Sequence, residues 1–401
     1  MSRIMSIFGT RPEAIKMAPI VARLQRTPNV ESVVCVTGQH RQMLDRMCEL
    51  FGLAPDVDLD LMKPGQRPVD VLCAAVGELA PIIRDASPDV ILVQGDTTTA
   101  MAAALAGAYE GAAIGHVEAG LRTFDKRQPF PEELNRLVVA ACGDLHFAPT
   151  ASSATNLIRE GHDPKTVWIT GNTVIDALLD VHARPFEPPP GDPLAEVPWD
   201  RDVILVTAHR RENFGQPMRD ALGAIAEIQK RSAGSAHVVY PVHPNPEVRA
   251  AVDDTLAGLD GITLLPPLDY QRLVHVMGRA RLIITDSGGI QEEAPALGKP
   301  VLVLRDVTER PEAVDFGTVK LVGCDPERII HETIRLLEDP SAYALMAERT
   351  NPYGDGRAAE RITAALTGAH VEEFCPDGDA DADLDAPTET APDTQATGTR
   401  G

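Results

Sequence analysis

Three acidic residues lie at positions that are typical of catalytic groups in proteins built from alternating strands and helices. Asp96 follows the apolar segment Val90–Val93, Glu118 follows the apolar segment Ala113–Val117, and Glu132 begins a helix after a proline-rich loop. Ligands of parallel α/β sheets bind outside the carboxyl ends of the strands, so we expect these carboxylates to face one cleft. There they can act in acid/base chemistry or bind the hydroxyl groups of a ligand.

Each of these acids also has a simpler structural explanation. Asp96 precedes Thr97–Thr99 and can cap the helix that follows. Glu132 lies four residues before Arg136, which is the spacing of an ion pair on a helix surface. No metal-binding pattern accompanies the acids, and their spacing does not decide between the structural and the chemical roles.

A glycine-rich turn in the second half of the chain predicts a phosphate site. The apolar segment Leu282–Thr285 runs into Asp-Ser-Gly-Gly and then a helix. Backbone N–H groups and the dipole at such a helix start favour an anion. Glu292 or Glu293, about one turn later, can accept hydrogen bonds from the two hydroxyls of a ribose. A capped helix with acids in its first turn is the structural alternative, but it does not require the paired glycines.

Basic residues follow the first strand of each half. Arg11 and Lys16 follow the segment that ends at Phe8, and Pro12 suits the first turn of a helix there. In the second half, His209 and Arg210 follow a buried strand. These cationic donors suit a phosphate, although each could also be a solvated surface charge.

Strands and helices alternate through most of the chain, which predicts an α/β fold with parallel sheets. A proline-rich segment interrupts this pattern near the middle, and the pattern then restarts. We therefore predict an N-terminal Rossmann-like domain at residues 1–183, a linker at 184–200 and a second Rossmann-like domain at 201–370. The acidic segment 371–401 is poor in large apolar residues, and we expect it to be disordered.

The composition argues against several classes of partner. The formal net charge is −22, which disfavours nucleic acid and anionic membrane surfaces. No apolar run is long enough for membrane insertion, and no targeting segment is recognisable. The six cysteines show no CxxC pair, as expected of reduced thiols in a cytoplasmic protein.

Ten sequence segments together resemble the non-hydrolysing UDP-N-acetylglucosamine 2-epimerase family. They occur in the order of the family over residues 3–366, and they read FGTRPEAIKMAPI, TGQH, QGDT, HVEAGLRT, FPEELNR, GNTVIDAL, TAHRREN, YPVHPNP, TDSGGIQEEAPALGKPVLVLRDVTERPEA and NPYGDG. Each segment alone is a weak signal, whereas the ordered set is specific.

The resemblance implies two Rossmann-like domains in the GT-B arrangement, with the UDP-sugar in the cleft between them. It implies reversible inversion of carbon 2, which converts UDP-N-acetylglucosamine to UDP-N-acetylmannosamine by elimination of UDP and its re-addition to 2-acetamidoglucal. No hydride cofactor and no metal are needed. The resemblance also suggests a homodimer, and it leaves room for the last helix to pack back on the N-terminal domain.

Residue roles follow from the resemblance position by position. Asp96, Glu118 and Glu132 would be the acid/base candidates, and Arg136 and His209 would assist with leaving-group charge or sugar positioning. The remaining residues expected to bind the substrate, with Glu293 on the ribose and the leucines near uracil, are Arg11, Lys16, Arg210, Asn213, Leu268, Leu273, Ser287, Gly288, Gly289, Glu293 and Arg310.

The resemblance also concerns a second, allosteric binding site for the UDP-sugar. Gln39, His40 and Gln42 match the first part of that site. In the second part, Gly65 stands where the family has an arginine, and Arg67 is the nearest replacement. The sequence therefore leaves allosteric activation open.

Two other activities fit the same scaffold. A relative acting on another UDP-2-acetamido sugar, such as a diacetamido uronic acid, would share every motif. A GT-B glycosyltransferase would share the fold, but it would need an acceptor and would not need three carboxylates around carbon 2. A small panel of UDP-sugars tests the first alternative, and product analysis with UDP-N-acetylglucosamine alone tests the second, because a transferase makes no UDP-N-acetylmannosamine.

Overall fold

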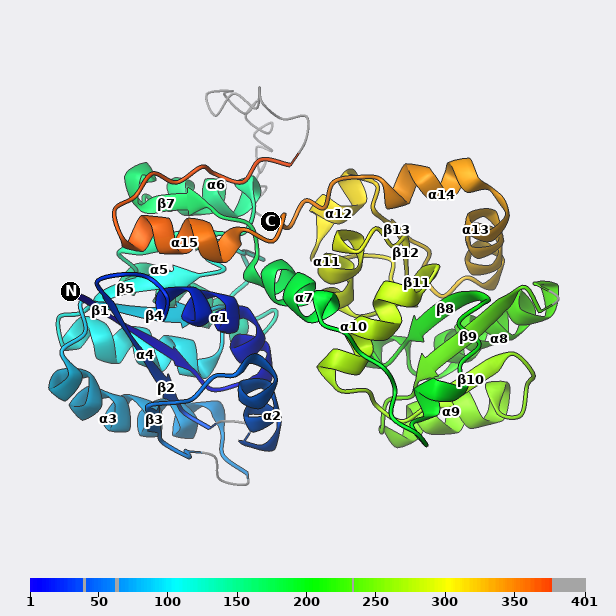
Figure 1. Cartoon of the computed structure of the whole chain (residues 1–401), viewed down its shortest axis with the longest axis horizontal. Helices are drawn as coiled ribbons and strands as arrows, with labels where there is room; N and C mark the ends of the chain where they lie inside the picture. Colours follow the sequence, from blue (N-terminus) through cyan, green and yellow to red (C-terminus); the bar gives the residue numbers. More distant parts are fainter. Residues whose placement is uncertain (39–40, 62–64, 233, 377–401) are drawn as a thin grey trace, which may run out of the picture.

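The computed structural model describes residues 1–38, 41–61, 65–232 and 234–376. Within these residues the strands form two parallel sheets of seven and six strands, each in its own domain (Figure 1). The strand orders are β3-β2-β1-β4-β5-β6-β7 and β10-β9-β8-β11-β12-β13. Both orders reverse direction beside the first strand of the domain, which is the doubly wound Rossmann pattern. The predicted fold class is confirmed.

The N-terminal sheet contains β1 (Ser2–Phe8), β2 (Val30–Val36), β3 (Val57–Asp58), β4 (Val90–Gln94), β5 (Ala113–Val117), β6 (Leu145–Ala148) and β7 (Val167–Ile169). The helices packed around it are α1 (Arg11–Leu24), α2 (Arg41–Phe51), α3 (Pro68–Ala86), α4 (Thr98–Tyr109), α5 (Glu132–Cys142), α6 (Ala151–Arg159), α7 (Thr173–Ala183) and, from the end of the chain, α15 (Ala358–Leu366).

The C-terminal sheet contains β8 (Asp202–Thr207), β9 (Ala236–Pro241), β10 (Ile262–Leu265), β11 (Leu282–Thr285), β12 (Val301–Val303) and β13 (Val319–Leu321). Its helices are α8 (Gln216–Arg231), α9 (Pro246–Leu256), α10 (Tyr270–Arg279), α11 (Gly288–Ala296), α12 (Pro311–Asp315), α13 (Pro326–Glu338) and α14 (Pro340–Ala347).

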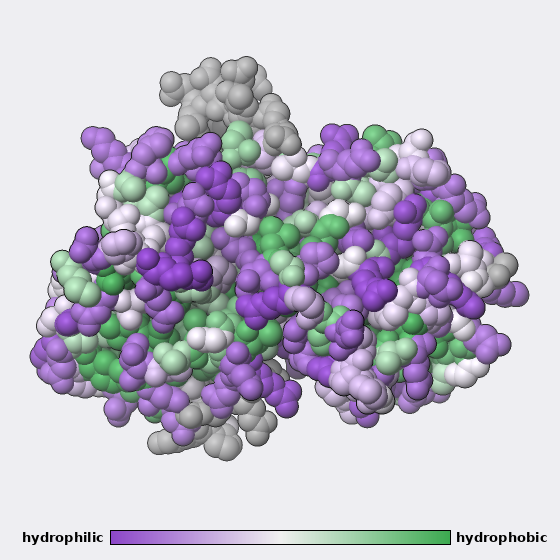
Figure 2. All heavy atoms as spheres, in the orientation of Figure 1, coloured by the Kyte–Doolittle hydropathy of each residue, from purple (hydrophilic) through white to green (hydrophobic). Residues whose placement is uncertain are grey.

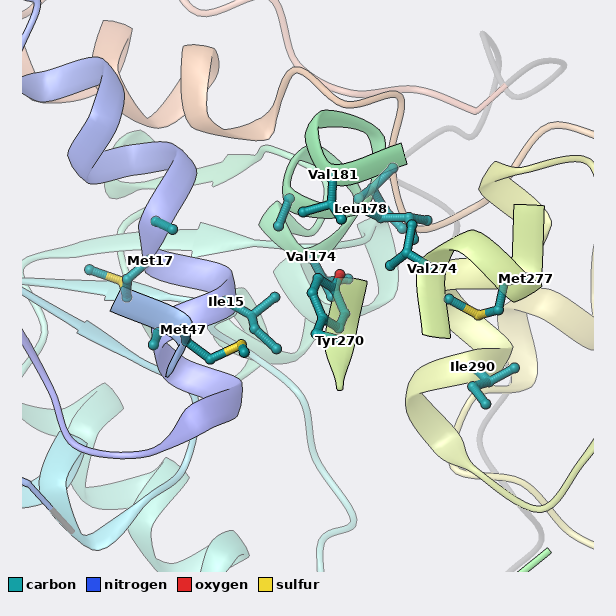
Figure 3. Close-up of a cluster of buried hydrophobic side chains, with 14 of the residues drawn as sticks. Ile15, Met17, Met47, Val174, Leu178, Val181, Tyr270, Val274, Met277 and Ile290 are labelled. Carbon is teal, nitrogen blue, oxygen red and sulfur yellow. The ribbon is translucent and has the colours of Figure 1, made fainter. Parts of the chain in front are cut away.

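Buried apolar residues join the two domains through α7. Figure 3 shows Ile15 and Met17 of α1 and Met47 of α2 on one side, and Val274 and Met277 of α10 on the other. Side chains of α7 lie between these two groups, and the whole set belongs to one continuous buried cluster. This contact fixes the relative position of the two sheet edges that form the cleft.

The chain crosses between the domains twice. After α7 the proline-rich segment leads to β8, and after α14 the chain returns so that α15 packs against α1 and α7 (Figure 1). The second connection touches the start of α7, because the backbone N–H of Asn172 donates to the carbonyl of Tyr353 at 2.7 Å. Gly171 and Gly354 meet there, and a Cβ on Gly171 would lie 3.3 Å from the Cα of Gly354.

The segment after α15 corrects one prediction. Phe374 is buried, and its N–H donates to the carbonyl of Ile169 on the edge strand β7 at 2.8 Å. The guanidinium of Arg361 also lies over the Phe374 ring. The prediction of disorder from residue 371 is therefore wrong up to Cys375, because one aromatic side chain and an open sheet edge are enough to order this stretch. Residues 377–401 lie outside the described part of the chain.

The surface is mainly hydrophilic in the view of Figure 2, with hydrophobic residues interspersed over both domains. In the described part of the chain, no helix is both long and apolar enough to cross a bilayer. All six cysteines lie in that part and are free, as the sequence predicts.

Candidate active site

Functional side chains gather where the carboxyl ends of the central strands of the two sheets face each other. In the N-terminal sheet, β1 and β4 are neighbours and lead to Thr10 and Asp96. In the C-terminal sheet, β8 and β11 are neighbours and lead to His209 and Asp286. In such sheets the reversal of strand order leaves a crevice in which ligands bind.

Glu118 follows β5 and is held by three donors from other elements. Lys16 of α1 contacts both carboxylate oxygens, at 2.6 and 2.7 Å, and Gln94 donates to Oε2. Asn172 donates to Oε1 at 3.1 Å. Burial alone would raise the pKa of Glu118, but the charge of Lys16, with its hydrogen bond, and that of Arg310 bring this pKa below its ordinary value. Glu118 is therefore ionised at neutral pH.

The backbone of Glu118 is also unusual. Its φ is 62°, in the left-handed region that a residue with a side chain rarely adopts. Such a conformation costs of the order of 1 kcal/mol and persists only where its surroundings enforce it. This turn directs the carboxylate toward Lys16 of α1 and Asn172, and strained residues of this kind concentrate at functional sites.

Asp96 and Arg136 form an ion pair between the end of β4 and helix α5. Arg136 Nη2 lies 2.6 Å from Asp96 Oδ2, and its Nη1 lies 3.0 Å from Glu133 Oε2. The structure thus gives Arg136 the partners Asp96 and Glu133, in place of the surface pair with Glu132 that its spacing suggested. Glu132 Oε2 is buried and has no hydrogen-bond partner among the described residues.

His209 is held at the end of β8 by Asp286. The Asp286 carboxylate accepts hydrogen bonds from the backbone N–H groups of His209 and Arg210, both at 2.7 Å. The His209 ring stacks on His243, and its Nδ1 lies 3.4 Å from Asp286 Oδ1. Burial lowers the pKa of His209, although the charge of Asp286 opposes this shift. The imidazole is therefore mainly neutral at pH 7.

The glycine-rich turn begins α11, as predicted, and Arg310 lies over it. A Cβ on Gly288 would lie 3.3–3.4 Å from the Arg310 guanidinium, so glycine allows the guanidinium to pack closely on the turn. Arg310 Nε lies 2.7 Å from Glu292 Oε1. The helix start therefore offers backbone N–H groups and a cationic side chain to the same space, which suits a phosphate.

The two acids of α11 have different surroundings. Glu292 pairs with Arg310 and accepts from Asn172 at 3.0 Å. Glu293 accepts from the hydroxyl of Tyr270 at 2.8 Å. Burial raises the pKa of Glu293 to about 7. The negative charge of Glu292 adds to this shift, and the hydrogen bond from Tyr270 opposes it. Of the two acids left open by the sequence, Glu293 is the one without a cationic side chain bonded to it.

A cavity of about 460 Å³ lies between the domains. Predicted substrate-binding residues from both domains line it: Arg11, Lys16, His209, Leu268, Leu273, Ser287, Gly289, Glu293 and Arg310. The cavity is large enough for a nucleotide-sized ligand. It is cationic on the side of Arg11, Lys16 and Arg310 and apolar near Leu268 and Leu273.

The remaining predicted residues do not line this cavity. Gly288 lies behind Arg310, and Glu118 lies behind Lys16. Asn213 is buried, and its amide donates to the carbonyl of Leu304 at 3.0 Å, so its position is structural here. Asp96 and Arg136 form a separate ion-paired group with Glu133, and Glu132 lies at the start of the same helix, α5.

Some residues of the site had no predicted role. Asn172 lies between Glu118 and Glu292, and Tyr270 holds Glu293. Glu13 accepts from Thr97 at 2.7 Å and from the backbone N–H of Thr10 at 2.8 Å, which ties the first loop to the loop of Asp96. Asn172 lies in a segment that contributed to the family resemblance, which was the only available signal.

The predicted allosteric residues are only partly described. Gln39 and His40 lie outside the described residues, and for Gln42 only its place in α2 is given. Arg67 pairs with Asp70 at the exposed start of α3, with Nη2 2.9 Å from Oδ1. The allosteric role of these residues remains a prediction.

Sequence comparison with known proteins identifies a family that matches this chain over most of its length. A family model described as UDP-N-acetylglucosamine 2-epimerase matches residues 22–367. The UDP-N-acetylglucosamine 2-epimerase of Yersinia pestis is 50% identical over 374 residues, which are 92% of this chain and 99% of the relative.

Solved structures give the same result. A UDP-GlcNAc 2-epimerase from Neisseria meningitidis, bound to UDP-GlcNAc, superposes with a TM-score of 0.80 at 43% identity and covers 91% of this chain and 100% of that one. S. aureus MnaA, in a structure with UDP, gives a TM-score of 0.81 at 42% identity, with 94% and 100% covered. The chain therefore belongs to the UDP-N-acetylglucosamine 2-epimerase family.

Proposed function

We propose that this protein is an isomerase that interconverts UDP-N-acetylglucosamine and UDP-N-acetylmannosamine by inverting carbon 2. The observation that carries the proposal is the link between cavity and carboxylate: Lys16 lines the cavity and contacts both oxygens of Glu118. Lys16 thus contacts the ionised carboxylate of Glu118 and also borders the space proposed for the phosphates. The arrangement suits a reaction in which a proton and a phosphorylated leaving group depart from neighbouring carbons.

The chemistry explains why both parts are needed. The hydrogen on carbon 2 is not acidic, because no carbonyl is adjacent to that carbon within the ring. A base removes it, the electrons of the C–H bond form a double bond between carbons 1 and 2, and the bond from carbon 1 to the UDP oxygen breaks. UDP then adds back to 2-acetamidoglucal while a proton is delivered to the other face of carbon 2.

The cavity is proposed to hold UDP throughout this cycle. Arg11, Lys16 and Arg310, with the N–H groups at the start of α11, would neutralise the pyrophosphate. Glu293 would accept hydrogen bonds from the ribose, and Leu268 and Leu273 would contact the uracil. His209 is uncharged in this environment and is suited to hydrogen bonding rather than to charge neutralisation.

The proton transfers are proposed for the carboxylates of the N-terminal domain. Ionised Glu118 can accept a proton from one face of carbon 2. Glu132 has a buried oxygen with no partner among the described residues, and this oxygen could carry a proton to the other face. Asp96, oriented by Arg136, is the third candidate. A homodimer and a cytoplasmic location are the further proposals that the resemblance supports.

Proton NMR of the full-length protein incubated with UDP-N-acetylglucosamine in heavy water tests this function. We expect UDP-N-acetylmannosamine to appear, with deuterium entering carbon 2 as epimerisation proceeds. Epimerisation without deuterium at carbon 2 would exclude the elimination. Release of free sugar and UDP would indicate a hydrolysing enzyme, and no reaction with this substrate, but turnover of another UDP-2-acetamido sugar, would correct the substrate.

A further inference from the structure

Asn172 forms a hydrogen-bonded bridge between carboxylates of the two domains. Its amide nitrogen donates to Glu118 Oε1 at 3.1 Å and to Glu292 Oε2 at 3.0 Å. Asn172, Glu118 and Glu292 are all buried. Glu118 lies in the turn after β5 of the N-terminal domain, and Glu292 lies in α11 of the C-terminal domain, so one neutral side chain connects the two halves of the site.

The orientation of this amide is set by its other contacts. Asn172 caps α7, and its Oδ1 accepts from the backbone N–H of Val174 at 3.1 Å. Its own backbone N–H donates to the carbonyl of Tyr353 at 2.7 Å. Since the oxygen already faces an N–H donor, the NH₂ group must face the two carboxylates. An asparagine satisfies both sides here, because it is an acceptor at one end and a double donor at the other.

Each carboxylate also has a cation that lines the nucleotide cavity. Lys16 pairs with Glu118, and Arg310 pairs with Glu292. A continuous chain of contacts therefore runs from Lys16 through Glu118, Asn172 and Glu292 to Arg310. Both ends of this chain face the space proposed for the pyrophosphate, and its centre is the asparagine.

We infer that Asn172 is a positioning residue that keeps Glu118 oriented and ionised when the nucleotide draws the two cations toward its phosphates. This inference rests on the proposed acid/base role of Glu118. A bound pyrophosphate competes with the carboxylates for Lys16 and Arg310, because both side chains are cations. The amide of Asn172 is neutral, so the phosphate charges attract it much less. The asparagine then remains the donor that holds Glu118 Oε1 in place.

The charged and polar groups around Glu118 determine how far its pKa shifts when Asn172 is substituted. They are the cations Lys16 and Arg310, the anion Glu292 and, two residues earlier on β5, the buried His116, in addition to the neutral donors Gln94 and Asn172. Removing a donor raises the pKa of a carboxylate, and adding a negative charge beside it raises the pKa further.

The test uses Asn172→Asp and Asn172→Ser in the full-length protein. Both side chains can still cap α7, because Asp and Ser are good capping residues. Aspartate places a third negative charge between the two carboxylates, and serine removes the bridge without adding charge. Far-UV circular dichroism and thermal melting check that each variant is folded.

We expect kcat to fall by about 10- to 100-fold, the range typical of a perturbed acid/base group. We also expect the acidic limb of the kcat/KM profile to move to higher pH, by about one unit in Asn172→Asp and less in Asn172→Ser. UDP affinity, measured by calorimetry, should change little in Asn172→Ser. Asn245 caps α9 through the same type of hydrogen bond, so Asn245→Asp is the matched control and should leave the acidic limb in place.

Glu118→Gln separates failure of this inference from failure of the proposed function. If Glu118→Gln retains the acidic limb, the proposed role of Glu118 is wrong and the inference falls with it. If Glu118→Gln abolishes the limb while both Asn172 variants leave it unmoved, Asn172 is only a helix cap and the inference alone is overturned.

Discussion

Two buried acids of the site, Glu118 in the N-terminal half and Glu293 in the C-terminal half, are stabilised in opposite ways, whereas Glu292 is paired with Arg310. In the N-terminal half, Glu118 and Asp96 are each paired with a cation from a different element, Lys16 and Arg136. In the C-terminal half, Glu293 is held by the hydroxyl of Tyr270, and its pKa is raised to about 7. The site therefore combines an ionised carboxylate, Glu118, with a carboxyl that is easily protonated, Glu293.

This difference indicates a division of labour. Paired carboxylates keep their charge and their direction, which acid/base catalysis requires. A carboxyl bonded to a neutral hydroxyl can exchange that partner for the hydroxyls of a ribose at little electrostatic cost. The cations Arg11, Lys16 and Arg310 lie along the boundary, where they can serve the phosphates and the carboxylates together.

The largest expected effect comes from Asp96→Asn. This change removes the charge and retains the shape, so we expect kcat to fall by roughly 10²- to 10⁴-fold while the UDP dissociation constant hardly changes. Steady-state kinetics and calorimetry measure the two quantities, with Asp85→Asn on the exposed part of α3 as the control. Equal losses of turnover and of UDP binding would mean that Asp96 is a binding or structural residue, and the division between the halves would not hold.

Glu293→Gln tests the other half of the comparison. The variant loses the proposed hydrogen bond between the ribose and a charged carboxylate. We therefore expect it to bind UDP about tenfold or more weakly above pH 7. In the parent protein the ribose favours the ionised carboxyl, so affinity should decrease as the pH falls below about 7, relative to the variant. The variant is the necessary reference, because the terminal phosphate of UDP titrates near pH 6.

Glu293→Gln should weaken UDP binding, but it should increase the stability of the ligand-free protein above pH 7. The pKa of Glu293 is raised from 4.5 to about 7, so the folded protein binds this proton more tightly than the unfolded chain does. Its contribution to the free energy of unfolding is therefore present at low pH and is lost as the pH rises through about 7. Without ligand, Glu293→Gln should raise the melting temperature at about pH 8. A lower melting temperature there would show that the buried charge is well compensated.

The smallest functional effect is expected at Asp176, outside both halves. Its carboxylate accepts from the backbone N–H groups of Ala358 and Ala359 at the start of α15, at 3.2 and 2.9 Å. Asp176→Ala should lower the free energy of unfolding by about 1 kcal/mol, the usual cost of a lost cap. Urea unfolding measures this loss, and turnover should stay unchanged. Loss of turnover at unchanged stability would show that docking of α15 contributes to the site.

Most of the fold could be predicted because buried parallel strands read as short apolar runs that end at Gly, Pro or polar residues. Strands β5 and β11 coincide with the apolar segments Ala113–Val117 and Leu282–Thr285 of the sequence. The two-residue edge strand β3 is too short to leave a periodic pattern.

The candidate site was predictable only in part. Residues that follow strands could be recognised by position, whereas their partners could not. Lys16 and Asn172 are 102 and 54 residues from Glu118 in the chain, and no local spacing encodes such contacts. Arg136 illustrates the same limit, because helical spacing accounts for its contact with Glu133, three residues away, but not for its contact with Asp96, 40 residues away.

The return of the chain to the N-terminal domain has a consequence for proteolysis. The proline-rich segment after α7 is one of two covalent connections, and the second delivers α15 onto α1 and α7. A protease that cuts the first connection therefore produces a C-terminal fragment that still carries a helix belonging to the other domain. We expect the contacts of that helix and the apolar contacts of α7 to hold the two fragments together, so that a nicked molecule keeps both walls of its cleft and migrates as one species.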